Sequence, residues 1–208
     1  MTQKTRVGLA YEANTVEEQK AAYDDWAASY ESDLCQMGYR IPAVAAAVFA
    51  RFITAPGGPI LDAGCGGGIQ SEALALSGYG PITGIDLSEG MLKVARSKGF
   101  YSELKQMALG GRLDFSDEQF AVVFSTGTIT PKHAPPESFD DLIRITRTGG
   151  KIIFSLRDDV NQEPEYPQAV KRHEKAGNWR HLFSTESFRS MPYGEPEISH
   201  RVHVYEKL

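Results

Sequence analysis

The sequence predicts a doubly wound α/β fold built on a mostly parallel, seven-stranded sheet with an antiparallel C-terminal strand. Two observations predict it. From about residue 59 to residue 156, short apolar runs alternate with segments of helical periodicity, which is typical of a parallel sheet covered by helices on both faces. After residue 176, two further apolar segments follow each other without a helix between them, and we expect such strands to pair antiparallel.

The N-terminal region 1–55 is predicted to be a helical cap with two helices. The first covers residues 15–34, because Thr15 and Glu18 have the spacing of a capping box and an aromatic stripe follows on one face. The second covers residues 42–53, because a proline suits its first turn and Pro56-Gly57-Gly58 would end it.

The remaining elements follow from apolar runs, proline starts and glycine stops. In the central region they are strand 59–63, helix 69–77, strand 81–86, helix 88–97, strand 102–107, strand 120–125, a helix opened by Pro135-Pro136 and strand 151–156, which begins after Gly149-Gly150. The C-terminal region adds a polar helix 161–176 and strands 179–185 and 199–205, and we expect segment 157–180 to be an insert on the substrate side. The whole chain, 1–208, is predicted to be a single domain.

A glycine-rich turn is the most informative local feature. Residues 60–68 read Ile-Leu-Asp-Ala-Gly-Cys-Gly-Gly-Gly, and Asp86 ends the next apolar run. Glycine allows backbone to approach a ligand closely, and a helix starting at Ile69 would direct free N–H groups toward that ligand. An acid at the tip of the second strand can accept hydrogen bonds from both ribose hydroxyls. The pattern therefore predicts a nucleoside-cofactor site.

The glycine spacing argues against a dinucleotide. A dinucleotide fingerprint starting at Gly64 would need glycine or alanine where Ile69 stands, and one starting at Gly66 would need it at Ser71. The run instead resembles the first motif of the class I S-adenosylmethionine-dependent methyltransferases, in which an acid, here Asp62, precedes the turn. An NAD(P)-dependent oxidoreductase remains an alternative, supported only by the shared order of strand, glycine turn, helix and acid.

Three further stretches carry the resemblance. Gly84-Ile-Asp-Leu-Ser-Glu-Gly-Met91 is similar to the second motif of that family, and Arg144-Ile-Thr-Arg-Thr-Gly-Gly-Lys151 looks like its approach to the fifth strand, with Thr148 where proline is usual. More narrowly, the stretch that starts at Gly127 and the N-terminal pattern Tyr-Asp-x-Trp-Ala-x-x-Tyr look like the methyltransferase-like proteins of the Williams–Beuren region. The family also implies a Rossmann-like fold.

The resemblance implies S-adenosyl-L-methionine as the cofactor and direct in-line displacement of its methyl group, with no metal. The residues expected to bind the cofactor are Asp62, Gly64, Cys65, Gly66, Asp86, Leu87, Met91, Leu109 and Ser125. Many relatives place an acid after the third strand to bind the adenine amine, but this chain reads Gln106-Met107-Ala108-Leu109. We therefore expect backbone groups near Leu109 to contact the adenine.

Each of these residues also has a purely structural interpretation. Asp86 is either the ribose ligand or a cap for the helix near Ser88. Asp62 either accepts backbone hydrogen bonds inside the turn or orients the methionine end of the cofactor through water. Cys65 is expected to be a small packing residue.

The aromatic stripe has two interpretations as well. Trp26 and Tyr30 either pack in the core or form a lid over the cofactor, since aromatic faces attract a cation such as a sulfonium. Tyr11 is either a solvated tail residue or part of a closing flap that contacts substrate.

Candidate catalytic and substrate residues lie in the loops. His133 follows the fourth parallel strand and is either a general base or a surface histidine bonded to a backbone carbonyl. Arg157 is either a substrate contact or solvated, and Trp179 either a pocket wall or a core residue. His200 and His203 are three apart on a strand, so they face opposite sides and share no metal.

The amino-acid composition limits which classes of partner the protein is expected to bind. The formal net charge is −5 and the basic residues form no stripe, so a small-molecule substrate is expected rather than nucleic acid. Two distant cysteines and the lack of an apolar span predict a cytoplasmic, membrane-free protein. Methyl transfer needs no diagnostic nucleophile, so a non-catalytic S-adenosylmethionine-binding regulator or partner subunit is a further alternative. The oligomeric state is not predicted.

Overall fold

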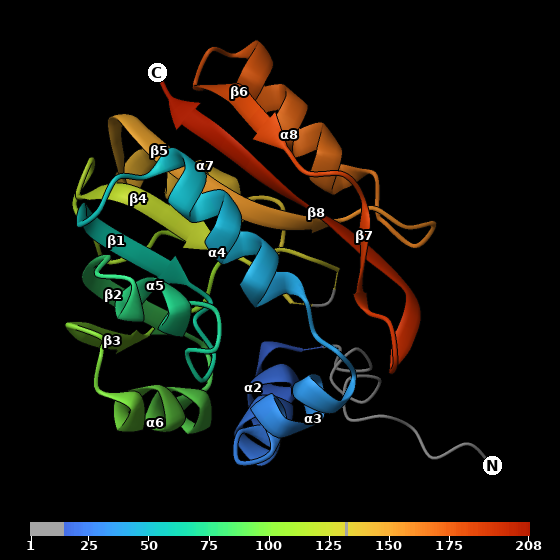
Figure 1. Cartoon of the computed structure of the whole chain (residues 1–208). Coiled ribbons are helices and arrows are strands. Elements are labelled where there is room, and N and C mark those ends of the chain that lie inside the picture. Colours follow the sequence, from blue (N-terminus) through green and yellow to red (C-terminus); the bar gives the residue numbers. More distant parts are fainter. Residues whose placement is uncertain (1–14, 132) are drawn as a thin grey trace.

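The computed structural model describes residues 15–131 and 133–208, and one mixed sheet of eight strands forms its centre (Figure 1). The strands are β1 (Gly57–Ala63), β2 (Gly80–Asp86), β3 (Glu103–Gln106), β4 (Phe120–Ser125), β5 (Thr146–Arg157), β6 (Trp179–Ser184), β7 (Phe188–Met191) and β8 (Glu195–Lys207). Their order is β3-β2-β1-β4-β5-β8-β6, and β7 pairs with β8 beyond that path. Strands β1 to β5 pair in parallel, whereas β8 is antiparallel to β5, β6 and β7. The predicted fold class is confirmed.

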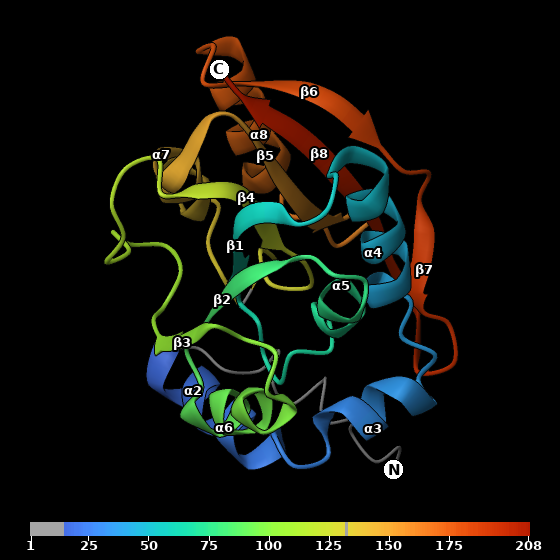
Figure 2. The same cartoon turned by 60° about the vertical axis from the view of Figure 1, so that its left-hand side comes forward.

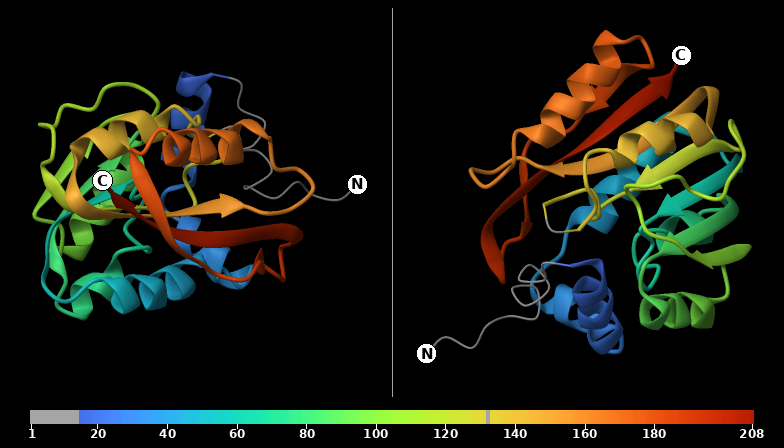
Figure 3. Two further views of the ribbon diagram at one scale, coloured as in Figure 1. Left: turned by 90° about the horizontal axis from the view of Figure 1, so that it is seen from above. Right: turned by 180° about the vertical axis from the view of Figure 1, so that it is seen from behind.

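Helices cover both faces of the sheet (Figure 3). They are α2 (Val16–Trp26), α3 (Tyr30–Gln36), α4 (Ile41–Phe52), α5 (Glu72–Leu76), α6 (Glu89–Lys98), α7 (Ser138–Ile145) and α8 (Glu165–Lys175). Helices α4 and α5 pack on one face, and α7 and α8 on the other. Within the described residues, no helix is long and apolar enough to cross a membrane.

Two apolar layers hold the helices to the sheet. In one layer, Phe49 of α4 and Leu74 of α5 pack on Ile60 and Val122. In the other, Phe139 and Leu142 of α7 pack on alternate positions of the same strands, such as Leu61 and Val123. Because successive side chains of a strand point to opposite faces, a strand covered on both sides is apolar throughout. This explains the continuous apolar runs in the sequence.

The N-terminal helix differs from its prediction. Thr15 caps α2 and accepts from the Glu18 N–H at 3.1 Å, as the capping box predicts. The helix ends at Trp26, however, and α3 begins at Tyr30. The Asp33 carboxylate accepts from Trp26 Nε1 at 2.7 Å and from the Ser29 hydroxyl at 3.0 Å. These side-chain bonds favour a turn over a continuous helix.

Glycines account for two other corrections. Helix α5 begins at Glu72 rather than Ile69, because residues 69–71 form a turn that closes on the Gly68 carbonyl, which accepts from the Ser71 N–H at 3.2 Å. The predicted strand 151–156 begins earlier, at Thr146, so Gly149 and Gly150 lie inside β5 at an irregular pairing with β4 instead of before it. Strand β7 was not predicted, because four residues with a mixed pattern give no periodic signal.

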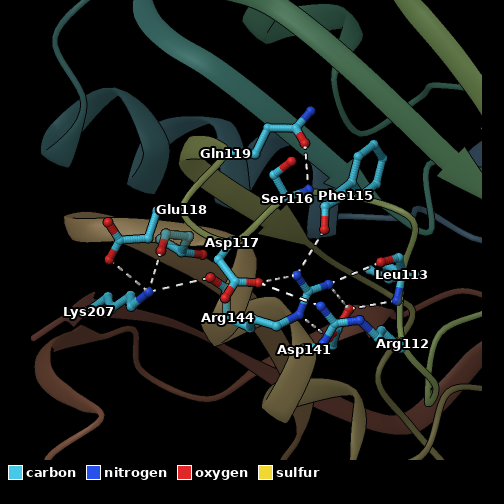
Figure 4. A network of polar contacts seen from close by, with 11 residues as sticks. Arg112, Leu113, Phe115, Ser116, Asp117, Glu118, Gln119, Asp141, Arg144 and Lys207 are labelled. Atoms are coloured by element: carbon cyan, nitrogen blue, oxygen red, sulfur yellow. Dashed lines mark hydrogen bonds and ion pairs between the residues drawn. The ribbon is translucent and has the colours of Figure 1, made fainter.

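The long connection between β3 and β4 is held by one guanidinium (Figure 4). Arg144 of α7 donates to the carbonyls of Phe115 at 2.8 Å and Leu113 at 3.0 Å, and it pairs with Asp117 at 2.6 Å and with Asp141. The Asp141 carboxylate also accepts from the Leu113 N–H at 2.7 Å. Bidentate, charge-assisted bonds of this kind fix geometry well. They anchor the connection whose first residues border the cavity described below.

Helix α2 lies beside α6 (Figure 2). The Asp24 carboxylate accepts from the Ser88 hydroxyl at 2.6 Å and from the Gly90 N–H at 2.8 Å, at the N-terminus of α6. A negative charge there satisfies a free helix N–H and interacts favourably with the helix dipole. Lys20 pairs with the same carboxylate at 2.7 Å. Asp24 therefore joins the first described helix to the segment that follows β2.

Candidate active site

A cavity of about 210 Å³ lies at the carboxyl edge of the parallel strands. Its walls come from the segments after β1, β2, β3 and β4, together with α2, α3 and α6. The residues that line it include Gln19, Tyr23, Tyr30, Gly64, Cys65, Gly66, Asp86, Leu87, Met91, Met107, Leu109, Thr126, Gly127, Thr128 and His133. Open α/β sheets bind ligands at this edge. Eight of the predicted cofactor residues, Tyr30 among them, thus border one space.

The glycine turn forms the floor of this cavity. The N–H groups of Gly64 and Cys65 both donate to the Ile85 carbonyl, at 2.8 and 2.9 Å, so the turn is tied to β2. Gly64 has φ +82°, and a Cβ there would lie 2.3 Å from the Thr128 side chain. A Cβ at Gly66 would meet no atom within 4 Å. The space above Gly66 is therefore open to a ligand.

Asp86 makes the capping contact with Ser88 and also borders the cavity. Its carboxylate accepts from the Gly66 N–H at 2.8 Å and from the Ser88 N–H at 2.9 Å, and it also lines the cavity. Burial raises the pKa of this carboxyl group, and the backbone bonds oppose that rise. The carboxylate thus braces the turn and presents an acceptor to the cavity.

Asp62 is fully buried under the turn. It accepts from the Ser71 hydroxyl at 2.6 Å and from the Tyr101 hydroxyl at 2.7 Å. These partners are side chains, so the interpretation that Asp62 binds backbone N–H groups is wrong. Its Oδ1 atom has no partner among the described residues. No sequence motif indicates Tyr101 or Ser71, because only the fold brings these residues to Asp62.

His133 lies on the cavity wall, partly buried, with its ring centroid 5.7 Å from that of Tyr23. Nδ1 is 3.2 Å from the Pro131 carbonyl and 3.1 Å from the Thr130 hydroxyl, which itself donates to that carbonyl at 3.3 Å. We therefore assign the proton to Nδ1 and the acceptor role to Nε2. Burial lowers the pKa of His133 to about 4. The imidazole is therefore neutral at pH 7, and the carbonyl contact matches one of the two sequence interpretations.

A family model described as "Methyltransferase domain" matches residues 61–154, which run from the glycine turn to β5. Methyltransferase-like protein 27 of Homo sapiens is 29% identical over 188 residues, covering 86% of this chain and 75% of the human protein. These matches support a class I S-adenosylmethionine-dependent methyltransferase.

Two other similarities agree with this assignment. The methyltransferase resembles the ubiquinone biosynthesis O-methyltransferase of Pseudomonas putida, with 33% identity over 117 residues. The match covers 54% of this chain and about half (49%) of the relative's length. Its fold is similar to the crystal structure of a Thermotoga maritima protein described as an S-adenosylmethionine-dependent methyltransferase, possible histamine N-methyltransferase. The TM-score is 0.67 at 15% sequence identity, and the match covers 89% of this chain and 98% of the Thermotoga chain.

The structure places other predicted site residues of the methyltransferase outside the cavity. Trp179 is 1% exposed and stacks on Phe154, so it is a core residue and not a pocket wall. Arg157 pairs with Asp159 at 2.8 Å. Ser125 donates to the Ala63 carbonyl at 2.8 Å within the sheet, and Thr126 to Thr128 line the cavity in its place.

The N-terminal aromatic residues divide between the two interpretations. Tyr30 lines the cavity, as the lid interpretation requires, whereas Trp26 is 3% exposed and packs with Leu34 and Met191. Tyr11 lies outside the described residues. Among those described, no group of three or more metal-ligating side chains is placed to hold a metal ion.

Cys65 borders the cavity but is not a nucleophile. Its side chain is 1% exposed, and burial together with the nearby carboxylates raises the pKa of the thiol well above its ordinary value. Thiolate is the reactive form, and these surroundings disfavour it. The expectation of a small packing residue agrees with this geometry.

Replacing Asp62 with Asn is expected to stabilise the ligand-free methyltransferase at pH 7. Burial raises the pKa of Asp62 to about 6 from an ordinary 3.8, and two pKa units correspond to about 3 kcal/mol. Because the folded-state pKa is raised, this group stabilises the fold fully only below pH 4, and that contribution is lost as the pH rises through 6. The neutral amide avoids this loss, although its unpartnered N–H₂ offsets part of the gain.

Thermal melts of Asp62→Asn and wild type at pH 4 to 7 test this expectation. We expect the melting temperature of the variant to exceed that of wild type by roughly 2–8 °C at pH 7, and the difference to close near pH 4. A variant that melts lower than wild type at pH 7 would show that the buried charge is not a destabilising feature.

Proposed function

We propose that this methyltransferase transfers a methyl group to a nitrogen, oxygen or sulfur atom of a small molecule by direct in-line displacement. One observation carries the proposal. The glycine turn, the Asp86 carboxylate and the neutral ring of His133 border a single cavity. A candidate ribose ligand and a candidate proton acceptor thus face the same space.

The residues present fit S-adenosylmethionine. Asp86 would accept hydrogen bonds from the ribose hydroxyls, and Leu87, Met91 and Leu109 would border the adenine. The open space above Gly66 suits a ligand that approaches backbone closely. The unpartnered Oδ1 of Asp62 lies buried beneath the turn, where it would orient the methionine end through water. When bound, S-adenosylmethionine supplies a methyl group on a sulfonium, whose sulfur keeps the bonding electron pair on displacement.

The chain's own residues then have three tasks: to align the acceptor, to exclude water and to receive one proton. Nε2 of His133 is the acceptor nitrogen of a neutral ring, so it can accept a hydrogen bond from a hydroxyl or amine nucleophile and orient it. Because burial lowers the pKa of this ring, His133 would hold the proton of the nucleophile only transiently. Tyr23 and Tyr30 enclose the cavity from the N-terminal side. Alignment of two reactants is itself a large part of the rate acceleration in such reactions.

The relatives favour a small acceptor. The Pseudomonas relatives are named as O-methyltransferases of ubiquinone biosynthesis. The net charge of −5 gives no electrostatic basis for binding nucleic acid. Both points support a small-molecule acceptor over a polynucleotide.

The test compares thermal melts with S-adenosylhomocysteine, S-adenosylmethionine, NAD and NADP. A ligand at about 100 times its dissociation constant adds about 2.7 kcal/mol, so the adenosyl compounds should raise the midpoint by roughly 5–10 °C. A shift with NAD or NADP alone contradicts the proposal. Labelled S-adenosylmethionine that binds but transfers no methyl group to any small-molecule acceptor would favour the non-catalytic alternative.

A further inference from the structure

A second, smaller cavity adjoins the first one. The two share Tyr23, Tyr30, Gly127 and His133, so they form neighbouring compartments of one site. The second compartment extends away from the glycine turn and Asp86, toward β7 and the middle of β8, where Met191 and His200 line it. A molecule in this compartment would lie next to the cofactor cavity without occupying it.

Aromatic rings dominate the walls of this second compartment. Tyr23, Trp26, Tyr30 and Tyr39 line it, and the Trp26 and Tyr30 rings meet edge to face with centroids 4.7 Å apart. The Trp26 indole N–H is directed to Asp33 at 2.7 Å, so the ring contributes apolar surface. Among the described residues that line this compartment, none is Asp, Glu, Lys or Arg. Such walls favour a flat, uncharged ligand, because burying a charge without a partner is costly.

His200 supplies a polar group deep in these walls. The side chain is 3% exposed, and Nδ1 lies 3.0 Å from the Ser190 hydroxyl. That hydroxyl donates to the Ile198 carbonyl at 3.3 Å, and in this arrangement it accepts from Nδ1–H of His200. The ring is thus held with Nδ1 protonated and Nε2 as an acceptor. Nothing in the sequence motifs indicated this role.

We propose that the second compartment binds the methyl acceptor as a small uncharged phenol, and that His200 selects it by accepting a hydrogen bond at Nε2. The inference rests on the proposed function and names its substrate class. The aromatic walls pack against the ring of the acceptor. His133, at the junction of the two compartments, serves the hydroxyl that faces the cofactor, and His200 serves a second hydroxyl on the same ring. A dihydroxybenzene satisfies both histidines.

The experiment measures binding of four probes to protein saturated with S-adenosylhomocysteine, by calorimetry. Catechol and phenol represent the proposed class, benzoate is an anion of similar size, and benzylamine is a cation. We expect catechol to bind more tightly than phenol, and benzoate not to bind. Benzoate or benzylamine that binds as tightly as catechol would overturn the substrate class.

Two substitutions distinguish the roles of the two ring nitrogens of His200. His200→Asn keeps a donor near the Nδ1 position and loses the Nε2 acceptor, whereas His200→Gln keeps an acceptor near Nε2. We expect catechol binding to weaken at least 10-fold in His200→Asn and less than 3-fold in His200→Gln, with phenol affected less than catechol in both. Equal catechol affinity in His200→Asn and wild type would overturn the role of His200.

The controls distinguish this inference from the proposed function. His181→Asn changes an exposed histidine of β6 that lines neither compartment and should leave all probes unaffected. S-adenosylhomocysteine affinity and the melting temperature show whether the His200 variants fold and retain the cofactor site. Failure of wild type to bind S-adenosylhomocysteine contradicts the proposed function itself. Normal binding of S-adenosylhomocysteine without any phenol binding contradicts only the second compartment's role.

Discussion

Replacing Asp86 with Ala is expected to weaken S-adenosylhomocysteine binding by at least about 100-fold, since a charged acceptor contributes about 1.5–3 kcal/mol for each hydrogen bond and a ribose offers two hydroxyls. The substitution also removes the acceptor for the Gly66 and Ser88 N–H groups. The glycine turn therefore loses its brace together with the ligand contact. Calorimetric titration with S-adenosylhomocysteine measures the effect.

Two further variants separate ligand binding from support of the turn. Asp86→Asn keeps the shape of the side chain and one acceptor oxygen, so we expect a smaller loss, of about 10-fold, with little change in melting temperature. Asp114→Ala removes an exposed carboxylate from the β3–β4 connection and should leave binding unaffected. Unchanged affinity in Asp86→Ala would refute the placement of the ribose at this carboxylate.

Replacing Gly64 with Ala is expected to destabilise the fold by about 3 kcal/mol, through backbone strain of about 1 kcal/mol and overpacking of 1–3 kcal/mol. The φ value of +82° disfavours any side chain, and the new Cβ would lie 2.3 and 2.4 Å from Cγ2 and Oγ1 of Thr128. The clash also moves the turn against the β4 loop. Urea or thermal unfolding measures the loss, which should lower the melting temperature by roughly 6–12 °C.

Gly99 provides a matched control. It has φ +73° at the C-terminus of α6, and a Cβ there would meet no atom within 4 Å. Gly99→Ala should therefore show the strain alone, about 1 kcal/mol. If Gly64→Ala and Gly99→Ala lose the same stability, the contact with Thr128 is not a constraint on the turn.

The strand positions of the central fold are largely predictable from sequence because most of the strands have a continuous apolar run. Strands β1, β2 and β4 are buried on both faces, so almost every residue of these strands is apolar or small. Element ends were harder to predict. The break after Trp26 depends on Asp33, seven residues away, and α5 starts only after the turn that closes on the Gly68 carbonyl. Such contacts leave no periodic signal.

The site was predictable where backbone geometry demands a residue type, as at Gly64 and Asp86. The role of a residue was not predictable where its possible roles differ only in how deeply the side chain is buried. Trp179 is equally compatible with a pocket wall and a core until the packing of Phe154 and Tyr205 is known. His200 is invisible to motif analysis, because its role depends on the pairing of β7 with β8, which brings Ser190 to its ring.

The carboxylate of Asp24 has a consequence for the rates of ligand exchange. It joins α2, which borders the cofactor cavity through Gln19 and Tyr23, to the N-terminus of α6. Separating the two helices breaks two charge-assisted hydrogen bonds, each of which contributes about 1.5–3 kcal/mol after exchange with water is counted. We expect a cofactor that exchanges past α2 to leave only when these bonds open. Residence time would depend on Asp24, a residue outside the cavity, as well as on the residues that contact the cofactor.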